Sequence, residues 1–170
     1  GFIKGWVGTI KNVTLKNVHL KTSGRSAILA GNVYSNIDNC HLEECTLEDS
    51  YWACGLIAGL YNSGNITNCS VDGCSVQSNG GTGGIVGVIN ESAGERKVEN
   101  CVVKNTTVNN LGSYGESYSG GLVCAMFNAG SATYHFNNCT LENNTKEGNY
   151  VGDLFYSAEG ETVYVDGVQQ

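Results

Sequence analysis

The sequence contains five imperfect copies of one short pattern: an apolar residue, any residue, Asn, then an apolar residue or Cys, any residue, and a second apolar residue. The anchor asparagines are Asn12, Asn39, Asn68, Asn100 and Asn138, which lie 27, 29, 32 and 38 residues apart. A fixed unit with loops of variable length explains this spacing, and a period of about thirty residues is typical of solenoid proteins. This repeat constrains the fold more than any other feature of the chain.

Each copy contains three short apolar segments that are joined by polar turns. The anchor segment is followed by an apolar-x-apolar piece, as in residues 74–76, and then by a small aliphatic piece, as in residues 55–58 and 84–87. Alternation with a period of two gives a strand one inward and one outward face. A single unit cannot bury its inward face, but stacked units bury it continuously. We therefore predict an all-β fold, a right-handed parallel β-helix (solenoid) of about five coils with three short strands per coil.

The whole chain, residues 1–170, is predicted to form a single β-helix domain. We expect its coils at residues 9–35, 36–64, 65–97, 98–134 and 135–160. Residues 1–8 resemble the last strand of a preceding coil or an N-terminal cap. Residues 161–170 alternate as a strand that closes the C-terminal edge, which would otherwise pair with other chains.

The anchor asparagines are predicted to be structural. Asn tolerates turn conformations, and its side-chain amide can bond to the Asn of the next coil, as it does in stacked sheets. Asn12, Asn39, Asn68, Asn100 and Asn138 would then form a ladder along the stack.

The chain has eight cysteines, and most of them occupy repeat positions. Cys40, Cys69, Cys101 and Cys139 share one position, and Cys45 and Cys74 share a second. Both positions alternate with apolar ones, so we expect these thiols to face inward as small core hydrophobes. A disulfide network and a zinc site are the alternatives. Stacked parallel Cβ vectors suit a disulfide poorly, and no His is placed to complete a zinc site, so no metal and no cofactor are predicted.

The composition limits the classes of partner and of chemistry. The net charge is −7, with 9 basic and 16 acidic residues, which argues against nucleic acid or an anionic membrane as a partner. No apolar run approaches the roughly 18 residues that cross a bilayer, so no membrane insertion is expected. The acidic residues scatter over outward positions, and His19 and His41 face outward while the cysteine rows face inward. These placements offer no acid–base pair and no nucleophile with a base, so no enzyme is predicted.

A candidate binding ridge lies in the variable loop before the third segment of each coil. Aromatic and basic side chains gather there if the coils stack in register. The ridge residues are Arg25, Tyr51, Trp52, Tyr114, Tyr118 and Tyr150. Exposed Tyr and Trp would suit sugar stacking or protein contact, and the alternative is that they fold back over the third strand. A second row, Tyr34, Tyr61, Phe127 and Tyr156 with Ile89 in the third coil, is expected to form a stacked corner ladder.

The repeat resembles the GLUG-type repeat over about residues 1–160. The resemblance lies in the Asn-Cys or Asn-Val segment and in the glycine-rich piece that follows it, which is Gly-Leu-Ile-Ala-Gly at residues 55–59 and Gly-Gly-Ile-Val-Gly-Val at residues 83–88. The fifth copy departs from the motif at Asp153 and Phe155, and the fourth departs at Cys124. The resemblance implies a bacterial secreted or cell-surface protein, such as those of gut anaerobes, with neighbouring coils or domains in a longer chain.

The functional expectation is a non-catalytic surface module with an adhesin-like recognition or stalk role. Its partner would be a glycan or a host or surface protein. The alternative is a carbohydrate-active β-helix, or an accessory carbohydrate-binding domain of a larger enzyme.

Overall fold

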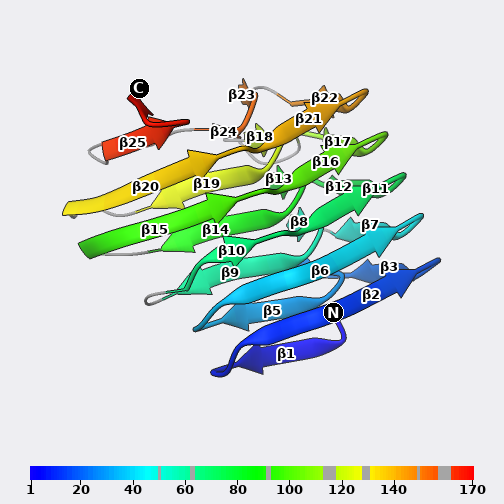
Figure 1. Ribbon diagram of the computed structural model, residues 1–170. Helices are drawn as coiled ribbons and strands as arrows, with labels where there is room; N and C mark the ends of the chain where they lie inside the picture. Colours follow the sequence, from blue (N-terminus) through cyan, green and yellow to red (C-terminus); the bar gives the residue numbers. More distant parts are fainter. Residues whose placement is uncertain are drawn as a thin grey trace.

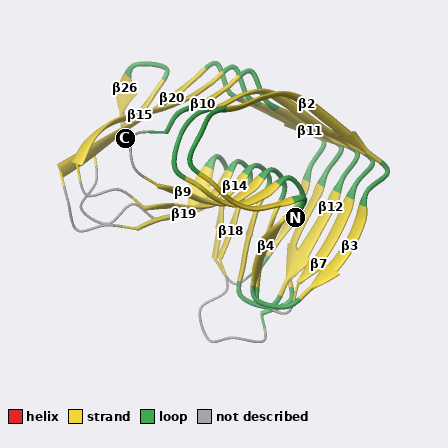
Figure 2. Ribbon diagram, turned by 90° about the horizontal axis from the view of Figure 1, so that it is seen from below, coloured by secondary structure: helices red, strands yellow, loops and turns green. Residues whose placement is uncertain are grey.

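The computed structural model describes residues 1–49, 51–61, 64–90, 93–112, 118–127, 131–148, 150–156 and 162–170. These residues contain β-strands and turns and no helix. The strands stack coil upon coil in parallel, and Figures 1 and 2 show the chain winding as a right-handed solenoid of about five coils. The predicted right-handed parallel β-helix is confirmed. In the described part of the chain, no helix is long and apolar enough to cross a membrane.

Four sheets run along the stack, and we number them in the order in which each coil visits them, starting from its anchor segment. Sheet 1 contains the anchor segments. Its strands are β2 (Ile10–Lys16), β6 (Ile37–Glu43), β10 (Ile66–Thr67), β11 (Ser70–Asp72), β15 (Ala93–Glu99), β16 (Val102–Lys104), β20 (Ser131–Asn137), β21 (Thr140–Glu142), β25 (Thr162–Val165) and β26 (Val168–Gln169). Sheet 2 contains β3 (His19–Thr22), β7 (Thr46–Asp49), β12 (Ser75–Ser78), β17 (Thr107–Asn110) and β22 (Thr145–Glu147).

The other two sheets return the chain to the start of the next coil. Sheet 3 contains β4 (Arg25–Ala27), β8 (Trp52–Cys54), β13 (Gly81–Gly83), β18 (Tyr118–Gly120) and β23 (Tyr150–Gly152). Sheet 4 contains β1 (Ile3–Trp6), β5 (Ala30–Val33), β9 (Ile57–Tyr61), β14 (Val86–Asn90), β19 (Val123–Phe127) and β24 (Phe155–Tyr156). Sheet 1 faces sheet 4, and sheet 2 faces sheet 3 (Figure 2).

One continuous apolar core fills the space between the facing sheets. Its inward residues stack in register: Leu42 pairs with Val71, which pairs with Val103, and all three are fully buried. Burial of each such side chain contributes about 1.5–3 kcal/mol. The period-2 alternation of the anchor segments thus produces the core that the sequence predicted.

The structure adds a fourth strand to each coil. Residues 55–58, expected as one strand, contain a corner, because β8 ends at Cys54 and β9 begins at Ile57. Glycines permit this corner. A Cβ at Gly84 would lie 2.0 Å from the carbonyl oxygen of Gly121 in the next coil, and one at Gly83 would lie 2.1 Å from that of Val86. The repeated glycines therefore mark the place where sheet 3 turns into sheet 4.

The five anchor asparagines all adopt the left-handed backbone conformation, with φ between 50° and 58°. Nδ2 of Asn39 donates to Oδ1 of Asn12 at 2.9 Å, Asn100 donates to Asn68 at 3.2 Å, and Asn138 donates to Asn100 at 2.8 Å. The ladder is interrupted at Asn68, which donates to Asp38 at 2.8 Å instead.

A second left-handed row lies at the turn from sheet 1 to sheet 2. Its members are Asn17, Glu44, Gly73, Asn105 and Asn143, with φ between 51° and 62°. The repeat pattern does not predict this row. Asn and Gly adopt this conformation readily, whereas Glu44 does so against the preference of its side chain.

The last strands close one part of the C-terminal end. β25 pairs in parallel with β20, and β26 turns back antiparallel on β25. The hairpin lies over Thr133–Phe136 of sheet 1 and leaves the edges of β21, β22 and β23 uncovered among the described residues.

Candidate functional site

Sheet 3 brings most of the predicted ridge residues into one row. Arg25 pairs with Trp52, whose row continues through Gly81 and Tyr118 to Tyr150. These residues therefore belong to strands, although the sequence suggested a loop. Tyr51 immediately precedes β8, while Tyr114 and the side chain of Tyr150 lie outside the described part of the structure.

Trp52 folds back over sheet 4, as the alternative interpretation of the ridge predicts. Its side chain is only 6% exposed and packs against Val88, Cys124 and Ala125, with Tyr118 beside them. The row has room for the indole because the third coil carries Gly81, where a Cβ would lie 2.8 Å from the Trp52 ring. Trp52 therefore fills the outer corner between sheets 3 and 4.

Two exposed side chains border the buried indole. The guanidinium carbon of Arg25 lies 5.2 Å from the centre of the Trp52 ring, within the range of a cation–π interaction. Tyr51 is 39% exposed, and its ring lies 6.2 Å from that of Trp52 at a tilt of 55°. We call this pair, Arg25 and Tyr51, the Arg25–Tyr51 surface. It presents a cation and an aromatic face on a rigid support, which suits contact with a sugar ring or a polar protein surface.

The second aromatic row differs from the expected one in two places. Tyr34 and Tyr61 stack with ring centres 5.2 Å apart and an interplanar angle of 24°. Asn90, not Ile89, occupies the third coil, because Ile89 pairs with Leu60 and is fully buried. Tyr156 pairs with Ala125, since the register shifts between Val123 and Ala125, and it therefore leaves the row.

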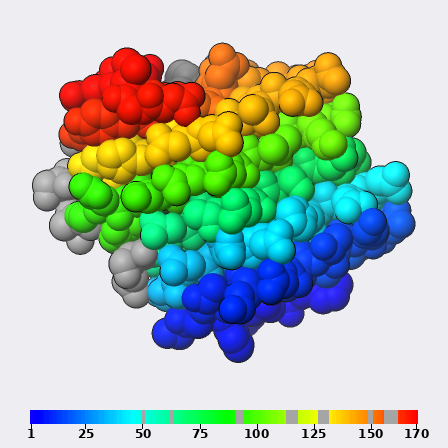
Figure 3. All heavy atoms as spheres, in the orientation of Figure 1, coloured from blue at the N-terminus to red at the C-terminus, as the bar shows by residue number. Residues whose placement is uncertain are grey.

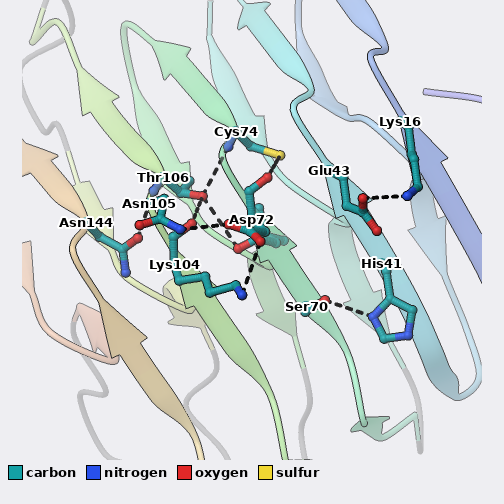
Figure 4. Close-up of polar contacts among 11 residues, drawn as sticks. Lys16, His41, Glu43, Ser70, Asp72, Cys74, Lys104, Asn105, Thr106 and Asn144 are labelled. Carbon is teal, nitrogen blue, oxygen red and sulfur yellow. Dashed lines mark hydrogen bonds and ion pairs between the residues drawn. The ribbon is translucent and has the colours of Figure 1, made fainter.

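The outward side chains of sheet 1 bond to one another along the stack (Figure 4). Lys16 lies 2.6 Å from Glu43, and Lys104 lies 3.2 Å from Asp72 in the same row. The His41 Nδ1 lies 2.8 Å from the Ser70 hydroxyl. Polar side chains on the outer face of one coil are therefore bonded to polar side chains of the neighbouring coil.

These contacts also set the protonation of two carboxyls. The side-chain hydrogen bonds from Asn105 and then Lys104 hold the pKa of Asp72 below its usual value. Those from Thr67 and Asn68 lower the pKa of Asp38 in the same way. A general acid needs a raised pKa, so neither carboxyl is tuned for that role.

A hollow of about 280 Å³ at the turn between sheets 2 and 3 holds two adjacent carboxylates, Glu48 and Asp49. Glu48 pairs with Lys21 at 3.0 Å on the surface. Asp49 is buried and accepts hydrogen bonds from the Thr22 hydroxyl and from the backbone N–H groups of Gly24 and Tyr51. These hydrogen bonds to Asp49 thus stabilise the turn beside Tyr51.

All eight cysteines are free thiols. Those of the two predicted rows follow the left-handed residues, and each donates to the carbonyl oxygen two residues earlier, as Cys69 does to Thr67 at 3.1 Å and Cys101 to Glu99 at 3.3 Å. Thr106 makes the same bond with its hydroxyl, to Lys104 at 2.8 Å. A thiol in these rows is therefore both a small core side chain and a weak donor at the bend.

Two cysteines outside these rows, Cys54 and Cys124, line the outer corner and belong to separate small apolar clusters. Burial raises the pKa of both thiols far above the ordinary value, so they are held as inert neutral groups. Among the residues that the structure describes, no group of three or more His, Cys, Asp or Glu is arranged to hold a metal ion.

The fold and these surfaces define a parallel β-solenoid protein with stacked polar rows and an aromatic outer corner. Comparisons with family models, curated proteins and solved structures gave no match to this chain.

Proposed function

We propose that the chain is a non-catalytic recognition module of a bacterial secreted or cell-surface protein, with a rigid, stalk-like body. One observation carries the proposal: the outward polar side chains of sheets 1 and 2 bond along the stack instead of converging on one point. Lys16 with Glu43, Lys21 with Glu48, and His41 with Ser70 are examples. Such rows suit a scaffold, and the likeness to GLUG-type repeats supports the surface location.

The Arg25–Tyr51 surface is the part of the module that would contact the partner. Both side chains are exposed, and they lie against the buried ring of Trp52, which holds them in place. A glycan or a polar protein surface is the partner that this pair fits best, because Tyr offers an apolar ring with a polar tip and Arg offers planar donors.

The competing function is a carbohydrate-active enzyme. Glycoside hydrolases need two carboxyl groups on either side of a scissile bond, one of them kept protonated. The hollow with Glu48 and Asp49 supplies two carboxylates, but they are consecutive residues, one ion-paired outside and one buried with three donors. This arrangement favours a binding role over hydrolysis.

A glycan array and a pull-down against host matrix proteins test the proposal. For the ligand so found, Tyr51→Ala and Arg25→Ala should each weaken binding by about tenfold or more. Tyr34→Ala is the matched control, since Tyr34 is 38% exposed and lies in the other aromatic row. Binding that survives both changes at the Arg25–Tyr51 surface, or silence in both screens, would reject recognition there. Cleavage of any bound glycan would reject the non-catalytic assignment.

A further inference from the structure

The hollow of about 280 Å³ at the turn from sheet 2 to sheet 3 runs along the side of the solenoid. Its lining comes from successive coils: Lys21 in the first, Glu48 in the second, Gln77 and Asn79 in the third, and Leu111 in the fourth. On the face formed by sheet 1, by contrast, the side chains of successive coils form continuous bands (Figure 3). The hollow therefore lies across the stacked coils, where a ligand could contact several of them at once.

The backbone that carries Tyr51 borders this hollow. The Tyr51 N–H donates to the Asp49 carboxylate at 2.8 Å. The Tyr51 carbonyl accepts from the Gly80 N–H at 2.7 Å, and Gly80 directly follows Asn79 of the lining. These bonds hold the Arg25–Tyr51 surface next to the hollow, so one elongated ligand could contact both.

The walls of the hollow offer hydrogen-bonding groups to a ligand. The side-chain amide of Gln77, in β12, makes no hydrogen bond within the described part of the structure. Glu48 accepts from Lys21 with Oε2 at 3.0 Å, and none of the described residues donates to its Oε1. An amide can both donate and accept, and a carboxylate accepts on two oxygens. This combination suits a ligand that carries neighbouring hydroxyl groups.

Leu111 adds an apolar wall. It is 54% exposed, and its N–H donates to the Ser78 carbonyl at 2.8 Å. The next residue, Gly112, has a φ of 68° and donates its N–H to Oδ1 of Asn110 at 2.9 Å. Backbone bonds on both sides thus hold an apolar side chain at the surface, where the C–H face of a sugar ring could cover it.

The charges around the hollow favour a neutral ligand. Two cations and two anions lie in the hollow and on the adjoining surface: Lys21, Arg25, Glu48 and Asp49. Their charges cancel, so they provide no net attraction for a charged glycan. The net charge of the whole chain, −7, repels an acidic polysaccharide.

We propose that the hollow binds a neutral, extended glycan of β-1,4-linked sugars that lies along the stack, with successive sugar units opposite successive coils. The inference rests on the proposed recognition function and names its class of ligand. Neighbouring strands lie about 4.8 Å apart, which is close to the advance of one sugar unit in such a glycan. Gln77 and Glu48 would bond to hydroxyl groups, while Leu111 and Tyr51 would contact the apolar faces of the rings. The volume is near the lower limit of about 300 Å³ for ligand pockets, which suits part of a linear chain.

Tetrasaccharides test the proposal by nuclear magnetic resonance. At least one of cellotetraose, mannotetraose and chitotetraose, titrated into the 170-residue chain, should shift the side-chain amide signals of Gln77 and Asn79 and the backbone amide of Leu111. Maltotetraose is the matched ligand control, because it contains the glucose units of cellotetraose in a curled α-1,4-linked chain that does not follow the coils. Tetragalacturonate tests the charge argument. Both controls should bind at least about tenfold more weakly than the extended neutral glycan.

Variants of the chain locate the binding. For the glycan that binds, Gln77→Ala and Leu111→Ala should each weaken binding by about threefold to tenfold. Asn109→Ala is the matched control, since Asn109 pairs with Gln77 in the same outward row but does not line the hollow. Circular dichroism checks the folding of each variant.

The failure of this inference differs from the failure of the recognition function. Binding that is lost in Tyr51→Ala but kept in Gln77→Ala and Leu111→Ala would overturn the role of the hollow and leave recognition standing. The absence of binding by all three β-1,4-linked tetrasaccharides up to about 10 mM, while another ligand binds at the Arg25–Tyr51 surface, would do the same. Equal binding of maltotetraose or of tetragalacturonate would overturn the extended or the neutral class of ligand. Silence with every glycan and every matrix protein would reject both proposals.

Discussion

The first and fifth coils carry different residues in the same inward rows. One row runs Leu20, Leu47, Val76, Val108 and Lys146, and another runs Val18, Cys45, Cys74, Thr106 and Asn144. The first coil is apolar in both rows, although its side chains are only half-buried. The fifth coil is polar in both, and the ammonium of Lys146 lies 2.5 Å from Asp153.

This difference shows how the same inward rows accommodate polar and apolar side chains. Asn144 is held inside the last coil, because its Nδ2 donates to the Val103 carbonyl and its Oδ1 accepts from the Thr106 N–H. Together with Lys146 and Asp153 it lines a hollow of about 450 Å³ at the C-terminal end. Polar groups in the fifth coil keep their solvation or find partners, whereas the apolar groups of the first coil stay half-buried against the second coil.

The largest loss of stability is expected when the lysine of the fifth coil, Lys146, is copied into the same row of the third coil, in the middle of the stack. We expect Val76→Lys to lower the free energy of unfolding by about 4 kcal/mol or more, because Val76 is fully buried between two coils and the ammonium would have no partner. Urea unfolding followed by circular dichroism measures this change.

The reverse substitution, Lys146→Val, is the matched control for that experiment. Its effect should stay within about 1 kcal/mol, because the pair with Asp153 is open to solvent on the Asp side. Similar losses from both substitutions would mean that the two layers do not differ in burial, and the comparison of the ends would fail.

A smaller loss of stability is expected when a residue of the first coil is copied into the same row of a later coil. Val13 takes the place of the thiols in the first anchor segment, so Cys101→Val tests what the thiol contributes. We expect a loss of about 1–2 kcal/mol, because the extra methyl group must fit a close-packed column and the Glu99 carbonyl loses a donor.

Cys74→Thr, which copies Thr106 in the same row, keeps a donor and should cost less than Cys101→Val in the same urea experiment. If Thr proved the more harmful of the two, the hydrogen bond at the bend would be unimportant. Side-chain volume alone would then determine which residues these two rows accept.

The anchor repeat was sufficient to predict the stacking, the fold and the inward direction of the two cysteine rows. Period-2 alternation could not reveal the corner at Gly84, because a turn made by close approach of backbones has no apolar pattern. The second left-handed row escaped detection because Glu44 and Gly73 share no side chain with the asparagines. The inward fold of Trp52 depends on Gly81 in the next coil, a relation between two sheets that a linear pattern does not contain.

The smallest expected effect is a pH-dependent loosening of the C-terminal end. The hydrogen bond and charge of Lys146 lower the pKa of Asp153 below its ordinary value of 3.8. Folding therefore favours the ionised carboxylate. This contribution to stability is fully present above pH 3.8 and is lost as the pH falls through the lowered pKa of the folded state. Because Asp153 is 94% exposed, solvent screens the pair and the effect stays local.

Hydrogen exchange resolves that local effect. Protection factors of the amides in β22 should fall between about pH 4 and pH 2 relative to those in β12, since Lys146 lies in β22 and Val76 lies in β12. In the Asp153→Asn variant, the β22 amides should start less protected and lose this added dependence on pH. Identical pH profiles for the wild type and this variant would show that the ion pair does not hold the last coil. The stability of the fifth coil would then rest on Asn144 and on the hairpin of β25 and β26.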